Sequence, residues 1–154
     1  MGTEIERKFL VDGPLSLDGP GRAMEQGYIA VDPDGTEARI RRETGLCVLA
    51  IKRGGGLVRH ETEIEVDEAT AESLWGLTEG RRVSKSRHLI VEGGTKIEVD
   101  VYGGPLSGLV VAEVEFESEA SATAFEPPDW FGREITGDAT FRNNVLARLG
   151  ELPE

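Results

Sequence analysis

Two carboxylates and an ammonium group are spaced for one face of a strand near the start of the chain. In an extended segment, Glu4, Glu6 and Lys8 point to one side, and Ile5 and Phe9 point to the other. Neighbouring carboxylates repel each other, and a cation between them removes that cost. A divalent metal ion that prefers oxygen ligands is the natural candidate. The segment therefore predicts a metal-binding strand face.

Turn residues divide the chain into short strands that would position this face. Glycine and proline recur between runs of alternating polar and apolar residues, as in hairpins. The predicted strands are 3–12, 24–32, 36–43, 46–53, 57–66, 81–92, 95–102 and 109–117. A helix is predicted at 68–78. Another is predicted at 143–149 in the tail 119–150, where Val145, Leu146 and Leu149 form an apolar stripe, and the tail is expected to cover one side of the sheet. Eight strands suit a closed antiparallel barrel, a mainly β fold with a few covering helices, in a single domain spanning 1–154.

Ionisable residues occupy alternate positions in most of these strands. They are Glu37, Arg39, Arg41, Lys52, Glu61, Glu63, Glu65, Lys85, Arg87, Lys96, Glu98, Asp100, Glu113, Glu115 and Glu117. The intervening residues form an apolar face that helices must cover: Ile40, Leu49, Ile51, Ile64, Val66, Ile97, Val99, Val101, Val114 and Phe116. For any single strand, a half-buried sheet with a solvated charged side is the alternative. Like charges cluster within strands, however, which favours a closed sheet whose polar interior binds a polyphosphate together with a metal.

Composition excludes several classes of partner. The net charge of −12 argues against nucleic-acid and anionic-membrane binding, because those surfaces reward a basic patch. No apolar run is long enough to span a membrane, no secretory signal is evident, and the single Cys47 fits a reducing compartment, so a cytoplasmic location is expected. His60 and His88 fall on the face opposite the charged series, so a histidine-based metal site is not expected.

Short motifs follow one another in a fixed order along nearly the whole chain. They are Glu4-Ile5-Glu6-Arg7-Lys8, Gln26-Gly27-Tyr28, Arg39-Ile40-Arg41, Ala50-Ile51-Lys52, Arg59-His60-Glu61-Thr62-Glu63, Lys85-Ser86-Arg87, Glu98-Val99-Asp100 and Glu113-Val114-Glu115. In this order they resemble the motifs of the CYTH superfamily, also called triphosphate tunnel metalloenzymes, and especially its short bacterial members. The resemblance implies an eight-stranded antiparallel tunnel that binds a triphosphate and a divalent metal, usually Mg²⁺ or Mn²⁺.

The resemblance also implies a role for each matching position. The leading metal ligands would be Glu4, Glu6 and Glu115, and the candidates for a second metal or its waters would be Glu113, Asp100, Glu61 and Glu63. The phosphates would be bound by Arg39, Arg41, Lys52, Lys85 and Arg87. Lys8 and Tyr28 would activate the attacking water. A tyrosine with an ordinary pKa near ~10 is a poor base at neutral pH, so this last role depends on its surroundings.

Three functions are compatible with the resemblance. Hydrolysis of inorganic tripolyphosphate to pyrophosphate and phosphate is favoured, because the start of the chain resembles that of short bacterial triphosphatases. A class IV adenylate cyclase, or an enzyme acting on thiamine or nucleoside triphosphates, is the first alternative. A non-catalytic polyphosphate-binding module is the second. The expected partner is a small triphosphate or short polyphosphate, and the oligomeric state is left open, a homodimer included.

Overall fold

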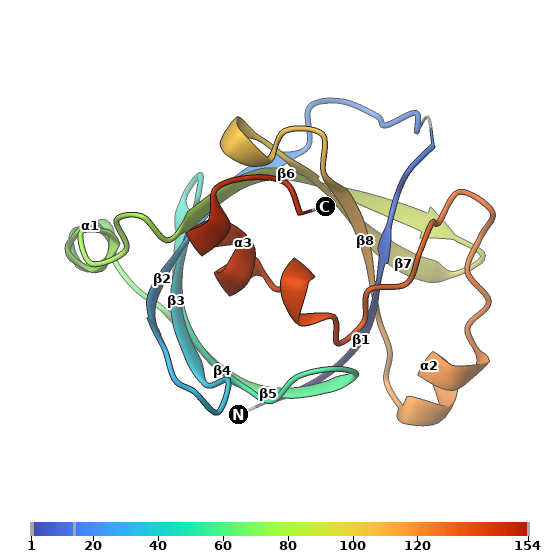
Figure 1. Ribbon diagram of the computed structural model, residues 1–154, viewed down its shortest axis with the longest axis horizontal. Coiled ribbons are helices and arrows are strands. Elements are labelled where there is room, and N and C mark those ends of the chain that lie inside the picture. Colours follow the sequence, from blue (N-terminus) through green and yellow to red (C-terminus); the bar gives the residue numbers. More distant parts are fainter. Residues whose placement is uncertain (1, 14, 154) are drawn as a thin grey trace.

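Eight antiparallel strands close into a barrel in the computed structural model, which describes residues 2–13 and 15–153 (Figure 1). Around the barrel the order is β1-β5-β4-β3-β2-β6-β7-β8. The strands are β1 (Gly2–Leu10), β2 (Arg22–Val31), β3 (Glu37–Glu43), β4 (Leu46–Arg53), β5 (Val58–Glu65), β6 (Arg82–Glu92), β7 (Thr95–Tyr102) and β8 (Val110–Glu115). The predicted closed barrel is confirmed, and the predicted strands coincide with the observed ones apart from a residue or two at some ends.

The strand register places the charged series on the inner face of the barrel. Tyr28 pairs with Arg39 across β2 and β3, and Lys52 pairs with both Glu37 and Glu61 on its two neighbours. Because paired residues point to the same side of a sheet, each charged series continues into the next strand. The interior is therefore ionic along much of its length.

Two helices cover parts of the outer face. Helix α1 (Glu68–Trp75) begins at Asp67, whose side chain accepts a hydrogen bond from the Thr70 amide, and it contacts β2, β3 and β4. Helix α2 (Glu119–Ala124) was not predicted, and with the following loop it covers β1, β7 and β8. Between these covers, Ile51 and Ile64 remain 42% and 55% exposed. The expectation that helices cover the whole apolar face is wrong at these two positions of β4 and β5, which α1 and α2 leave uncovered.

The C-terminal segment lies across one end of the barrel. It comprises the short helix η2 (Ala139–Phe141) and α3 (Asn143–Leu149), drawn in red within the ring of strands in Figure 1. Leu146 is fully buried and packs in a cluster with the inward-facing Tyr28, Tyr102 and Val111. The helix in the tail is confirmed, but it closes an end of the barrel instead of covering one side of the sheet. The interior is thus apolar at this end and ionic beyond it.

Two smaller features complete the fold. The short helix η1 (Gly104–Leu106) connects β7 and β8 and was not predicted.

Gly27 lies against Thr78 so closely that a Cβ atom there would be 2.4 Å from the Thr78 hydroxyl, so this contact requires glycine. In the described part of the chain, no helix is long and apolar enough to cross a membrane.

Candidate functional site

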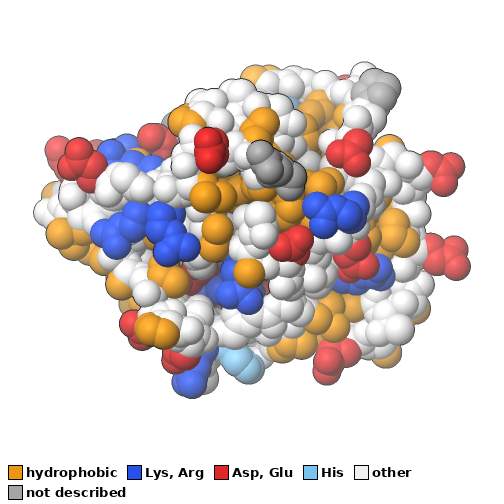
Figure 2. All heavy atoms as spheres, viewed as in Figure 1, with side chains coloured by type: hydrophobic (Ala, Val, Ile, Leu, Met, Phe, Trp, Pro, Cys, Tyr) orange, Lys and Arg blue, Asp and Glu red, His pale blue; other side chains and the backbone are white. Residues whose placement is uncertain are grey.

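A cavity of about 270 Å³ occupies the ionic part of the barrel. All eight strands and the segment at the start of α3 line it: Glu4, Glu6, Lys8, Arg22, Gln26, Tyr28, Glu37, Arg39, Arg41, Lys52, Arg59, Glu61, Glu63, Lys85, Arg87, Glu98, Glu113, Glu115, Arg142, Asn143 and Asn144. Every site residue predicted from the sequence is in this set except Asp100. On the outer face seen in Figure 2, Lys and Arg lie in separate small groups between acidic and apolar atoms. The Lys and Arg side chains that line the cavity lie together inside the barrel.

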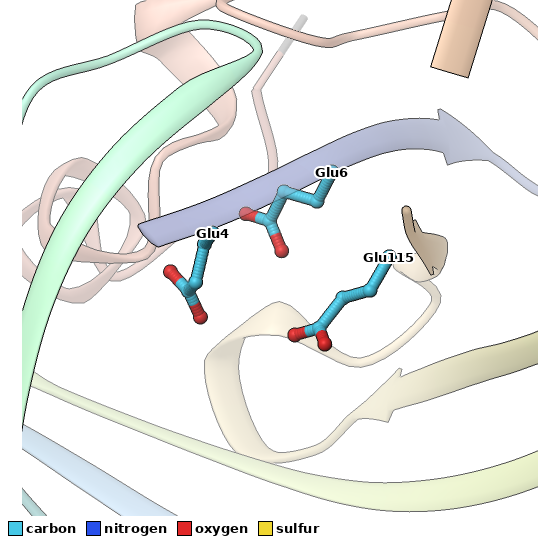
Figure 3. A group of neighbouring side chains, drawn as sticks. All are labelled: Glu4, Glu6 and Glu115. Atoms are coloured by element: carbon cyan, nitrogen blue, oxygen red, sulfur yellow. The ribbon is translucent and has the colours of Figure 1, made fainter. Parts of the chain in front are cut away.

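Three carboxylates converge on one point of the cavity wall. Glu4 and Glu6 come from β1 and Glu115 from β8, where Glu6 and Glu115 are paired in register. Each offers a carboxylate oxygen, and these oxygens lie within 4.8 Å of one another (Figure 3). Burial, with the nearby Glu113 carboxylate, raises the pKa of Glu6 to about 7, and burial with Glu4 also raises the pKa of Glu115. The three acids are costly to ionise together without a cation, and their oxygen donors suit Mg²⁺ or Mn²⁺.

Two guanidinium groups on β3 have unused hydrogen-bond donors. Arg39 and Arg41 follow the alternation of the strand and line the cavity. The Nε atom of each is buried and has no hydrogen-bond partner among the described residues. Burial and the neighbouring Arg39 lower the pKa of Arg41. Buried donors that lack partners are costly, and an anion in the cavity would satisfy them.

Lys52 lies between acidic groups from two strands. Its Nζ atom is 3.2 Å from Glu4 Oε2 and 3.4 Å from Glu61 Oε2. Burial, together with Glu4 and Glu63, raises the pKa of Glu61 to about 7, although Lys52 opposes the shift. Lys52 thus partly neutralises the acidic side of the cavity, and its side chain lines the cavity.

Asp100 holds two of the predicted phosphate-binding residues. Lys85 Nζ donates a hydrogen bond of 2.7 Å to Asp100 Oδ2, and Arg87 donates bonds of 2.8 and 2.9 Å from Nε and Nη2. Asp100 is fully buried, and although burial opposes its ionisation, Lys85 and Arg87 hold the pKa of this carboxyl well below its usual range. Both oxygens are engaged and the residue does not line the cavity. The structure therefore places Asp100 behind the cations, away from the position expected for a metal ligand.

Lys8 and Tyr28, the predicted water-activating pair, have separate partners. Lys8 Nζ lies 3.6 Å from Glu113 Oε1 and 3.8 Å from Glu6 Oε1, and these two acids raise the pKa of Lys8 although burial opposes them. Tyr28 accepts a hydrogen bond of 3.3 Å from Gln26, and burial and Glu37 raise its pKa above the ordinary value. At neutral pH, Lys8 is therefore an ammonium and Tyr28 a phenol. Both can donate hydrogen bonds, and neither is a ready base.

Several cavity residues were not among the predicted site residues. Arg59 shares the alternation of Glu61 and Glu63 on β5, so the period-two pattern contained its signal. The segment Arg142–Asn144 comes from the tail, where no pattern in the sequence indicates that it enters the barrel. The remaining members are Arg22, Gln26, Glu37 and Glu98.

Comparison with characterised proteins gives two relatives of similar length. The chain is 45% identical over 150 residues to an inorganic triphosphatase of Nitrosomonas europaea, with 94% of this chain and 97% of that protein covered. It is 38% identical over 151 residues to an inorganic triphosphatase of Acetivibrio thermocellus, with 96% and 95% covered. No protein-family model matches the chain.

Solved structures show the same architecture. A crystal structure of an inorganic triphosphatase superposes with a TM-score of 0.71 at 40% identity, over 98% of this chain and 100% of that one. A putative adenylyl cyclase from Hippeastrum, described as having a dominant triphosphatase activity, superposes with a TM-score of 0.64 at 17% identity, over 97% of each chain. The second similarity supports the fold alone.

Proposed function

Because the chain belongs to the inorganic triphosphatase family, we propose that it hydrolyses inorganic tripolyphosphate to pyrophosphate and phosphate. The observation that carries this proposal is the cavity itself, in which the guanidinium groups of Arg39 and Arg41 face carboxylates gathered on the opposite strands. An inorganic triphosphate with a divalent cation satisfies both groups, because its oxygens accept from guanidinium donors and its counter-ion binds carboxylates.

We also propose that Glu4, Glu6 and Glu115 hold Mg²⁺ or Mn²⁺. The support is their convergence within 4.8 Å, together with the raised pKa of Glu6 and Glu115, which a cation would relieve. When bound, such an ion would neutralise phosphate oxygens and lower the pKa of a bound water. Glu113, Glu61 and Glu63 line the same cavity and stay candidates for a second ion or its waters.

The basic residues would orient the phosphates and stabilise the charge that develops during hydrolysis. Phosphoanhydride cleavage needs an aligned water and a neutralised leaving group, and the protein supplies little covalent chemistry. Arg39 and Arg41 would use their free donors on phosphate oxygens. Lys85 and Arg87, held by Asp100, present fixed positive charge to the same space.

Lys8 and Tyr28 fit a donating role in this reaction. The Lys8 ammonium, close to Glu6 and Glu113, would hold a water or a phosphate oxygen in place. The Tyr28 phenol is buried in the cavity wall and would donate its proton in a hydrogen bond, since its raised pKa disfavours the phenolate. The cavity carboxylates, and not Tyr28, are therefore the candidate proton acceptors for the attacking water.

The test is phosphate release from tripolyphosphate, ATP and thiamine triphosphate, each measured with Mg²⁺, Mn²⁺ and chelator. We expect tripolyphosphate to be turned over fastest, and chelator to abolish the activity. Glu4→Gln and Glu6→Gln should lose turnover while the barrel stays folded by circular dichroism. Glu134→Gln, which alters an outer ion pair with Arg7, is the matched control and should retain activity. Cyclic AMP formation from ATP would instead indicate a cyclase, and no turnover of any substrate would indicate a binding module.

A further inference from the structure

A buried carboxylate lies in the part of the cavity where anions are expected to bind. Glu37 is 3% exposed, lines the cavity and pairs in register with Lys52. It is outside the group of Glu4, Glu6 and Glu115. A negative charge at this position repels a polyphosphate, so its presence needs another physical reason.

The contacts of Glu37 supply that reason. Arg59 Nη2 donates to Glu37 Oε1 at 3.1 Å, and Asn144 Nδ2 donates to Glu37 Oε2 at 2.7 Å. Arg59 is fixed from a second side, because its Nε donates to the Gly54 carbonyl at 3.0 Å. One carboxylate thus joins β3 to a cation on β5 and to the helix that closes the barrel.

Among the residues that the structure describes, these two contacts leave Arg59 with unused donors. A guanidinium has five N–H groups, and the bonds to Glu37 and Gly54 use two of them. The side chain is 15% exposed and lines the same cavity as Lys8 and Glu6. A planar guanidinium held at two points is preorganised for a phosphate, because little side-chain entropy remains to be lost on binding.

We propose that Arg59 is a further phosphate-binding residue and that Glu37 is the positioning residue that holds it, with Asn144 tying this pair to α3. The inference rests on the proposed function, since tripolyphosphate is the ligand that Arg59 would contact. Closure of the barrel end and alignment of a phosphate-binding cation then depend on the same carboxylate.

The direction in which Glu37→Gln changes the KM for tripolyphosphate distinguishes a positioning role from a purely electrostatic one. Removing a negative charge from a polyanion site should tighten binding if Glu37 acts only through its charge. If Glu37 positions Arg59, Glu37→Gln should raise the KM for tripolyphosphate about tenfold, which corresponds to the loss of one charge-assisted hydrogen bond, with a smaller change in kcat. An unchanged or lower KM would overturn the proposal.

A double-mutant cycle tests whether Glu37 acts through Arg59. In an Arg59→Gln background, Glu37→Gln should raise KM no further, whereas fully additive effects would contradict the positioning role. Arg59→Lys keeps the positive charge but loses the planar set of guanidinium donors, so it should also raise the KM for tripolyphosphate. An unchanged KM in this variant would count against the proposal even if Glu37→Gln fails to fold. Glu134→Gln serves as the control, because it alters a guanidinium–carboxylate pair outside the cavity.

A binding measurement separates failure of this inference from failure of the proposed function. Calorimetric titration of tripolyphosphate into the protein in chelator needs no turnover. If the unmodified protein binds tripolyphosphate in chelator but releases no phosphate from it with Mg²⁺ or Mn²⁺, the proposed function fails, while weaker binding by the Glu37→Gln and Arg59→Lys variants still supports Arg59 as a ligand-binding residue. Equal binding by both variants and the unmodified protein would overturn the inference alone.

Discussion

Replacement of Asp100 by asparagine tests whether this carboxylate holds cations or binds a metal. Asp100 is fully buried and accepts three hydrogen bonds, of 2.7, 2.8 and 2.9 Å, from Lys85 and Arg87. Removing one partner of a buried ion pair typically costs about 3 to 5 kcal/mol. Arg87 retains Glu98 at 2.8 Å, so the lower value of about 3 kcal/mol is expected. For a chain of this length, that loss lowers Tm by about 6 to 12 °C.

Urea unfolding in chelator, repeated with Mg²⁺, measures this loss. If Asp100 holds Lys85 and Arg87, the Asp100→Asn variant loses stability in chelator and is still stabilised by Mg²⁺. If Asp100 were a metal ligand, removing its charge would change stability in chelator by less than about 1 kcal/mol and would abolish the Mg²⁺ effect. That result would contradict a role for Asp100 in holding Lys85 and Arg87. Glu134→Gln, at a partly exposed ion pair, is the control and should cost less than about 1 kcal/mol.

The pH dependence of stability gives the same assignment an independent check. Because the folded-state pKa of Asp100 lies below its unfolded value, the stability that it contributes is present above the unfolded pKa of about 4. It is lost as the pH falls toward the lower folded-state pKa. The difference in unfolding free energy between the unmodified protein and Asp100→Asn should therefore shrink in acid.

Three further expectations concern the acidic group, the free guanidinium groups and a tight glycine contact. In chelator, the folded-state pKa of Glu6, about 7, lies above the unfolded value, so the stability that Glu6 contributes falls as the pH rises to 7. Thermal melts should therefore show that Mg²⁺ raises Tm more near pH 8 than near pH 5.5. An equal rise at both pH values would contradict this. Arg41→Gln should raise the KM for tripolyphosphate about tenfold in kinetic assays without lowering Tm, because burial already disfavours its charge, and a lower Tm with unchanged KM would indicate a structural role. Gly27→Ala should lower the unfolding free energy in urea by about 1 to 3 kcal/mol, because the added Cβ atom would clash with the Thr78 hydroxyl. Gly13→Ala, in open space, should change it by less than about 0.5 kcal/mol, and equal effects would contradict the contact.

The strands were predictable because their signals are local. The alternation of Glu61 and Glu63 with Thr62 and Ile64 fixes which face of β5 carries charge, whatever the strand packs against. The position of α3 depends instead on contacts between distant segments, such as Leu146 with Val111 inside the barrel. The apolar stripe in the sequence indicates a helix but not the surface that it covers.

The site was predictable as a set of residues and not as an arrangement. Alternation and the order of the motifs place Asp100 and Glu115 on the same inner face. Only the three-dimensional distances show that Asp100 is bound by Lys85 and Arg87. Glu115, in contrast, lies close to Glu4 and Glu6. The free energy cost of ionising Tyr28 likewise depends on burial, which a strand pattern does not report.

A crystal structure of the protein with Mn²⁺ and a non-hydrolysable tripolyphosphate analogue would show directly where the metal and the phosphates bind, because anomalous scattering locates the metal. We expect a metal peak within about 2.2 Å of oxygens from Glu4, Glu6 and Glu115, with phosphate oxygens bound to the free donors of Arg39 and Arg41. A metal bound elsewhere, or an analogue held outside the barrel, would contradict it.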